Sequence, residues 1–251
     1  MNKLSLSLFA AGVAALTAAG TNTADAVSTG PNAPIRHTVF SFTYSTTSDL
    51  TEQTSGLQGG PESGMKHYGA GGQDQGTVTV DITGVQSDGG LIVSVSEAAR
   101  DTRSAAPVTC AVYGDTRVIC EPDQKVNEEE FSVLRFMGRQ FLDPSKLDNH
   151  EHWHLASDSS GFSMTSDFTV NGGTSAAQNI SETTVYKSSG SEPFTTTTDG
   201  KLVYDVDKTI PLYISQDSTS RQTRGMGMDN LQHTQIELRL QTDSMNAVGK
   251  Q

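Results

Sequence analysis

Residues 76–95 read GTVTVDITGVQSDGGLIVSV, and this stretch carries the pattern that decides the fold. Apolar side chains occupy every second position in both of its halves, at Val78, Val80, Ile82, Leu91, Val93 and Val95. A period of two residues is typical of a β-strand with one buried face. Aspartate and glycine residues between the halves mark a turn, so the stretch predicts one strand followed directly by another.

The same alternation recurs along most of the chain. It is found around residues 40–44, 108–120, 151–156, 161–171, 180–187, 193–198, 201–206, 210–221 and 232–242. Strand follows strand with almost no helix between them, which favours antiparallel pairing. We therefore predict a mainly β protein, with a single curved antiparallel sheet or open half-barrel of about 11–12 strands. The glycine-rich residues 53–76 are expected to form a long loop between the first two strands.

One segment has the period of a helix instead. Asn127 is a helix N-cap residue, and Glu130 stands at the capping-box position three residues later. The helical segment has an apolar stripe of Phe131, Leu134, Gly138, Phe141 and Leu142, and a separate polar stripe of Glu128, Ser132, Arg135 and Arg139. This pattern predicts an amphipathic helix over 128–141, within a helical insert near 128–148.

The apolar stripe of this helix must be buried against the sheet. It then either covers the core or borders a ligand cavity, and the sequence leaves both alternatives open. Phe131, Leu134 and Phe141 are accordingly the candidate ligand-binding residues.

The first 26 residues have the features of a secretory signal peptide. Lys3 precedes a mildly apolar run over residues 4–20, and Ala24, Asp25 and Ala26 provide a small-x-small cleavage pattern. The run is shorter than the ~20 apolar residues that span a bilayer. We expect export to the periplasm or the cell exterior, a single β-rich domain over 27–251, and no integral membrane segment after cleavage.

Cys110 and Cys120 are the only two cysteines of the chain. The alternating residues that flank them, and the turn signal at Gly114 and Asp115, predict a hairpin in which the two cysteines lie opposite each other. An oxidising compartment would join such a pair. We therefore expect a structural disulfide and not a redox or metal-binding cysteine pair, which needs closer spacing or further ligands.

The charge balance excludes one class of partner. The chain has 17 Lys and Arg against 29 Asp and Glu, and a formal net charge of −12 at pH 7. A negative surface without a basic run repels phosphates, so a nucleic-acid partner is not expected. The polar surface is instead supplied by 28 serines and 30 threonines.

Residues that could carry chemistry are few. His150, His152 and His154 are the metal-ligand candidates, but in a regular strand the outer two lie about 13 Å apart, at ~3.3 Å per residue. We therefore expect them on the solvent side of a strand whose Trp153 packs inward, with no metal site and no cofactor. The nucleophile motifs of the common hydrolases are missing from the sequence, which favours a non-catalytic protein and leaves the question of an enzyme open.

A curved antiparallel sheet with a helix across its mouth resembles, in its order of elements, the bacterial periplasmic lipoprotein carriers. Their open half-barrels are covered by short helices. No residue motif is shared, so the resemblance assigns no residue a role. It implies an exported, non-catalytic carrier or binder of an apolar small molecule or lipid. The alternatives are a surface or matrix interaction protein without a ligand cavity, and a secreted hydrolase whose site the sequence does not identify. The oligomeric state is left open.

Overall fold

The computed structural model describes residues 38–54, 65–87, 90–99, 106–113, 116–121, 124, 126–137, 152–159, 161–174, 177–190, 193–224 and 228–244. Several expectations fall outside these residues: the signal segment 1–26, Phe141, His150, and the second helical turn before residue 148. Within the described chain, the structure is one 11-stranded sheet with a short helix, which confirms the predicted fold class.

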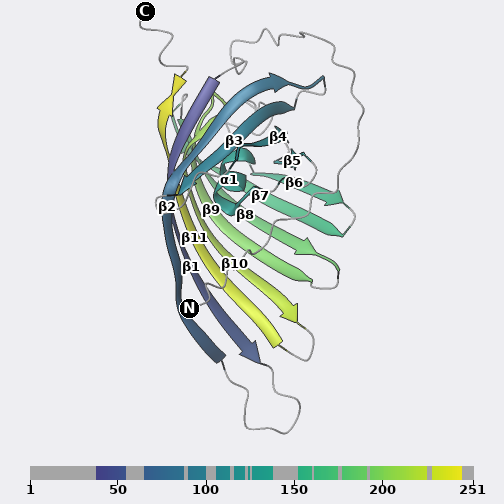
Figure 1. The fold of residues 1–251 in the computed structure, drawn as a ribbon. Helices are drawn as coiled ribbons and strands as arrows, with labels where there is room; N and C mark the ends of the chain where they lie inside the picture. Colours follow the sequence, from purple (N-terminus) through teal and green to yellow (C-terminus); the bar gives the residue numbers. More distant parts are fainter. Residues whose placement is uncertain are drawn as a thin grey trace, which may run out of the picture.

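All neighbouring strands of the sheet are antiparallel. From one edge to the middle they are β5 (Val118–Cys120), β4 (Val108–Val112), β3 (Leu91–Ala99), β2 (Met65–Val85) and β1 (Thr38–Thr54). From the middle to the other edge they are β11 (Met228–Asp243), β10 (Ile210–Arg224), β9 (Phe194–Asp205), β8 (Ala177–Ser188), β7 (Phe162–Gly173) and β6 (His152–Ser159). Figure 1 shows the resulting curved sheet.

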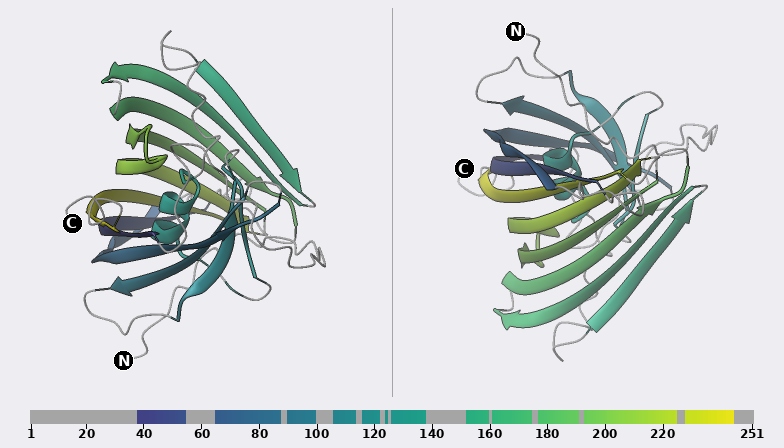
Figure 2. Two further views of the ribbon diagram at one scale, coloured as in Figure 1. Left: turned by 90° about the horizontal axis from the view of Figure 1, so that it is seen from above. Right: turned by 90° about the horizontal axis from the view of Figure 1, so that it is seen from below.

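The first and last strands pair at the centre of the sheet, and its two edges are consecutive in the chain. β1 pairs with β11 along almost its whole length. The edge strands β5 and β6 do not pair with each other, so the sheet stays open. The chain crosses from one edge to the other through the segment that contains the helix α1 (Glu128–Leu134). Figure 2 shows α1 inside the curve of the sheet.

Two strands differ from the sequence-based expectation. The loop predicted over 53–76 is wrong for its second half, because β2 begins at Met65 and pairs with β1 through the glycine-rich residues. The separate strands predicted over 193–198 and 201–206 form one strand, β9, which passes through Gly200 without a turn. In both places pairing with neighbouring strands supplies the hydrogen bonds that hold glycine in an extended conformation.

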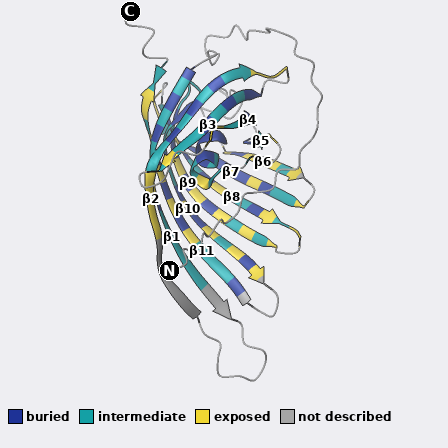
Figure 3. Cartoon of the chain, viewed as in Figure 1, coloured by how far each residue is buried: buried dark blue, intermediate teal, exposed yellow. Residues whose placement is uncertain are grey.

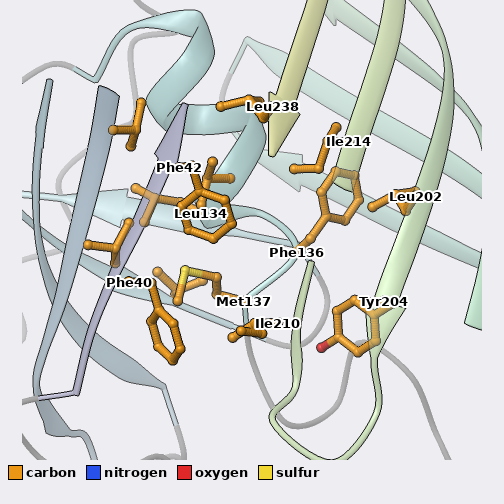
Figure 4. Packing of buried hydrophobic residues seen from close by; sticks show 14 of the residues in the cluster. Phe40, Phe42, Leu134, Phe136, Met137, Leu202, Tyr204, Ile210, Ile214 and Leu238 are labelled. Atoms are coloured by element: carbon orange, nitrogen blue, oxygen red, sulfur yellow. The ribbon is translucent and has the colours of Figure 1, made fainter. Parts of the chain in front are cut away.

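The apolar core lies between α1 and one end of the concave face. Burial alternates along the strands, as Figure 3 shows, and one row of directly paired residues is apolar across four strands: Ile180, Leu202, Ile214 and Leu238. Leu134, Phe136 and Met137 pack against this end of the sheet (Figure 4). Covering each such side chain is worth roughly 1.5–3 kcal/mol, so this packing holds α1 on the concave face.

Candidate functional site

The helix α1 begins where the sequence predicts and ends earlier. The Asn127 side chain accepts a hydrogen bond from the Glu130 backbone N–H at 2.7 Å, and the Glu130 carboxylate accepts one from the Asn127 N–H at 3.0 Å. This is the predicted capping box. The helix ends at Leu134, and tighter i→i−3 hydrogen bonds from Phe136 and Met137 follow it.

The predicted apolar stripe is therefore only partly present in the described residues. Leu134 is fully buried, while Phe131 is half-buried and its ring meets Tyr186 edge-on at 6.0 Å. Phe136 is also fully buried, and its ring lies 6.4 Å from that of Phe168 on β7. Phe136 is not part of the predicted apolar stripe, yet it lies in the core.

Arg135 departs most from the amphipathic pattern. The predicted solvent-facing stripe is wrong here, because the Arg135 side chain is only 2% exposed and is the largest of the fully buried side chains. Its Nη2 donates hydrogen bonds to Ser166 Oγ at 3.2 Å and to Thr184 Oγ1 at 3.0 Å. The same atom lies 3.4 Å from Oε2 of Glu182, whose side chain is fully buried. A buried charge is costly unless it is paired, and here Nη2 alone makes the pairing, because the buried Nε of Arg135 has no hydrogen-bond partner among the described residues.

Glu182 reaches this position across a glycine. It pairs directly with Gly200, where an added Cβ would lie 2.4 Å from Glu182 Oε1. The free space lets the carboxylate lie over β9 and accept a hydrogen bond from Gln216 Nε2 on β10 at 2.5 Å. The end of α1 is thus fastened to β7, β8 and β10 through one polar network.

Beside this network the concave face changes from apolar to polar. A row of directly paired residues on five neighbouring strands carries only hydroxyl side chains: Ser166, Thr184, Thr198, Ser218 and Thr234. All five are buried. Thr184 donates to Ser166 at 2.8 Å, and the hydroxyls of Thr198 and Ser218 lie 2.9 Å apart. The concave face therefore combines an apolar half under α1 with a hydroxyl-lined half beyond it.

Carboxylates gather around the N-terminal end of α1. The Thr46 hydroxyl donates to Glu129 at 2.6 Å, and the Tyr44 hydroxyl donates to Glu97. Burial raises the pKa of Glu97, and burial also raises the pKa of Glu130. The surrounding protein, with some repulsion from Glu129, raises the pKa of Glu128 to about 7. Of these carboxyls, Glu128 has a pKa near neutral pH.

The histidines and the tryptophan lie on opposite faces, as predicted for the residues that are described. Trp153 is buried and stacks on Phe168 at 5.0 Å, whereas His152 and His154 are exposed. His154 Nδ1 lies 2.9 Å from an oxygen of Asp167. In the described part of the chain, no group of three or more His, Cys, Asp and Glu side chains is placed to hold a metal ion.

Cys110 and Cys120 form the predicted disulfide. They are directly paired residues of β4 and β5, with Cα atoms 3.9 Å apart. The bond joins the short edge strand β5 to its only partner strand and lies beside the apolar core, in which Cys110 is buried. It closes a hairpin whose second strand has only three residues, of which Val118 is also buried in the core.

Comparison with known proteins gives a likeness at the level of structure alone. No protein-family model matches the sequence, and no curated protein matches it. The fold is similar to that of a solved structure described as "Lipid-protein interactions in lipovitellin", with a TM-score of 0.37 and 8% sequence identity. The likeness covers 83% of this chain and 25% of the lipovitellin chain, so this chain spans about a quarter of that protein. In the described residues, no helix is long and apolar enough to span a membrane.

Proposed function

We propose that the protein is an exported, non-catalytic carrier or binder of an apolar or lipid-like ligand, held between α1 and the concave face of the open sheet. The observation that carries this proposal is the position of α1. In the described part of the chain, one short helix covers the apolar half of a sheet that is not closed, and this helix belongs to the crossing between the two free edges. The proposed ligand would replace part of the contact that α1 makes with the apolar row.

The helix is suited to this role because it has little stability of its own. It has seven residues, and isolated helices shorter than ~12–15 residues are marginal in water. Its position therefore depends on Leu134, Phe136 and the polar network of Arg135. Leu134 and Phe136 make the apolar part of these contacts, so an apolar ligand that offers the core of the sheet equivalent contacts would compete with these two side chains.

Export is part of the proposal. The supporting observations are the signal pattern of residues 1–26 and the disulfide between Cys110 and Cys120. Disulfides persist in oxidising compartments such as the periplasm and the cell exterior.

One observation favours a second candidate function, that of a surface or matrix interaction protein without a ligand cavity. Val133, Leu134 and Phe136 are each 0% exposed, so the apolar half of the concave face is fully covered by the chain itself. In this case α1 is part of the core and does not move.

Uptake of an apolar fluorescent probe distinguishes the two functions. Trp153 is the only tryptophan and belongs to the core cluster with Leu134 and Phe136, so it can transfer energy to bound N-phenyl-1-naphthylamine. We expect the purified protein to take up this probe, and native mass spectrometry to show a co-purified apolar mass. Leu134→Ala should change the probe dissociation constant by about tenfold and cost less than the ~2–5 kcal/mol of a core leucine.

The matched control is Leu231→Ala, the same substitution at a half-buried position of β11 away from α1. It should leave probe uptake unchanged. Absence of uptake in the unmodified protein, together with a loss of ~2–5 kcal/mol in Leu134→Ala, would reject the carrier and leave the interaction protein.

A further inference from the structure

The two free edges of the sheet differ in how well they are protected. An exposed edge strand has unpaired backbone groups that can pair with another chain, and monomeric β-proteins shorten, interrupt or cover such strands. β5 is protected in this way, since it has only three residues and is tied to β4 by the disulfide. β6, at the other edge, has eight residues, and Figure 2 shows it as the last strand of the sheet.

β6 lacks the features that usually protect an edge strand. Its residues 152–159 include no proline, glycine or lysine. It pairs with β7 residue for residue, whereas the pairs β1–β2 and β7–β8 contain register shifts. In the part of the chain that the structure describes, β7 is its only partner strand. β6 therefore presents a regular edge to which another strand can add.

The side chains of β6 are complementary to a second copy of the same strand. Antiparallel pairing about a twofold axis perpendicular to the sheet keeps the concave faces of both copies on one side, so exposed residues stand opposite exposed residues. With Leu155 opposite its own copy, exposed His152 stands opposite exposed Asp158 of the partner subunit. The symmetry produces this pair twice, once toward each end of the contact.

The protein already contains such a contact within one chain. His154 and Asp167 are directly paired residues of β6 and β7, and His154 Nδ1 lies 2.9 Å from Asp167 Oδ1. In His152, Nδ1 lies 3.0 Å from the Thr169 hydroxyl, which leaves Nε2 for a further contact. The Asp158 carboxylate has no hydrogen-bond or ion-pair partner within the described ranges. Each copy thus supplies a partner for the other.

The neighbouring register offers less. Centred on Ala156, the pairing would bring His154 opposite Asp158, but His154 already contacts an aspartate of β7. We propose that two copies of this chain form an antiparallel dimer along β6, centred on Leu155, in which His152 of each copy contacts Asp158 of the other. The dimer uses the backbone edge and the exposed face of β6, so it does not depend on the proposed ligand under α1.

Sedimentation velocity on the purified protein tests this proposal. One strand pair buries less than the ~1,200 Å² of a standard interface, so the measurement should extend from about 1 to 200 µM. We expect a reversible monomer–dimer equilibrium. Hydrogen exchange on the unmodified protein gives a second measurement, in which protection of the β6 amides should rise with concentration while that of β9 stays constant.

A charge swap tests the register. Asp158→Lys removes the carboxylate that faces His152, and His152→Asp sets two carboxylates opposite each other. Each should raise the dimer dissociation constant about tenfold, because the twofold axis makes each change act twice. The double variant His152→Asp/Asp158→Lys restores opposite charges and should return the constant to within about threefold of the unmodified value. Residues that act only within one chain would show no such rescue.

Asp199→Lys is the matched control, since it makes the same change of charge at an exposed position of the inner strand β9. It should leave the dissociation constant within about twofold of the unmodified value. Trp153 is buried on β6, so unchanged emission shows that a variant keeps this strand in place.

Five results would overturn the proposal. They are a monomer at every concentration, β6 protection that does not depend on concentration, oligomers that grow beyond the dimer, a dimer that both single variants retain, and single variants that the charge swap does not rescue. Growth beyond the dimer would instead indicate pairing of β6 with β5 of the next copy.

Discussion

At the scale of one residue, two opposing effects act on the charge of the Glu128 carboxyl. At the N-terminus of a helix, an ionised carboxylate is favoured by the exposed backbone N–H groups. In this fold desolvation by the surrounding protein, with repulsion from Glu129, raises the pKa of this carboxyl to about 7. The local sequence favours a charge at this position, and the tertiary structure opposes it.

The raised pKa predicts a dependence of stability on pH. In the unfolded chain the carboxyl has its ordinary pKa of 4.5, so between about pH 4.5 and 7 the folded state binds more protons than the unfolded state. The free energy of unfolding must then fall as pH rises through this window. We expect Glu128→Gln to be more stable than the unmodified protein at pH 8, by at most about 1 kcal/mol because solvent screens this exposed residue.

Urea unfolding at pH 5 and pH 8 measures this effect. The difference between Glu128→Gln and the unmodified protein should shrink toward zero at pH 5. Glu237→Gln, at an exposed site on β11, serves as the control for loss of one negative charge. A Glu128→Gln variant that is less stable than the unmodified protein at pH 8 would show that the helix N-terminus outweighs burial and repulsion.

At the scale of the element, two glycines let large side chains lie across neighbouring strands. Gly76 on β2 faces the Tyr44 ring, in the same way that Gly200 on β9 faces Glu182. An added Cβ at Gly76 would lie 2.4 Å from the carbonyl oxygen of Ala98 and 2.7 Å from Cε1 of Tyr44. Such contacts can be relieved only by movement of the β3 backbone and of a buried ring.

Gly76→Ala should therefore destabilise the protein by about 1–3 kcal/mol, the usual cost of overpacking. Gly84→Ala is the control within the same strand, because its Cβ would meet only Ile92 Cδ1 at an ordinary 3.5 Å. We expect that variant to change stability by less than ~0.5 kcal/mol or to stabilise slightly, since alanine loses less backbone entropy than glycine. Equal denaturation midpoints for the two variants would contradict the close packing of Tyr44 over Gly76.

At the scale of the whole molecule, the first strand, β1, and the last strand, β11, lie side by side at the centre of the sheet. The pairing of β1 with β11 joins residues about two hundred positions apart, whereas every other strand pair is formed by consecutive strands. The ends of these two strands also meet, since Val39 N–H donates to Ser244 Oγ at 2.9 Å. The sheet therefore consists of two up-and-down meanders, β1 to β5 and β6 to β11. They are joined at the centre by the pairing of β1 with β11.

A circular permutant should therefore fold, and fold faster. A short glycine-serine linker would join Ser244 to Thr38, and the new termini would lie between Met137 and His152. Every strand pair then becomes local, and lower contact order speeds folding. Stopped-flow refolding followed by Trp153 fluorescence should be several-fold faster than for the original chain. Exposure of Trp153 in the refolded permutant would show that the crossing between the edges is needed to hold β6.

Much of the fold was predicted from local pattern. The alternation of apolar residues gave the strands and their antiparallel pairing, and the cysteine hairpin placed Cys110 opposite Cys120. Asn127 and Glu130 correctly marked the start of α1. Each of these features depends on residues close together in the sequence, which is why the sequence alone specifies them.

The candidate sites were determined only by the tertiary structure. Burial of Arg135 requires Ser166 and Thr184, which lie 31 and 49 residues further along the chain. The hydroxyl row Ser166, Thr184, Thr198, Ser218 and Thr234 exists only because the strands pair in one register. A period of two shows which residues share a face, but the face that is concave and the residues that lie side by side on it follow from long-range pairing. Local pattern in the sequence determined most of the elements, and the pairing of strands far apart in the chain decided which polar residues meet.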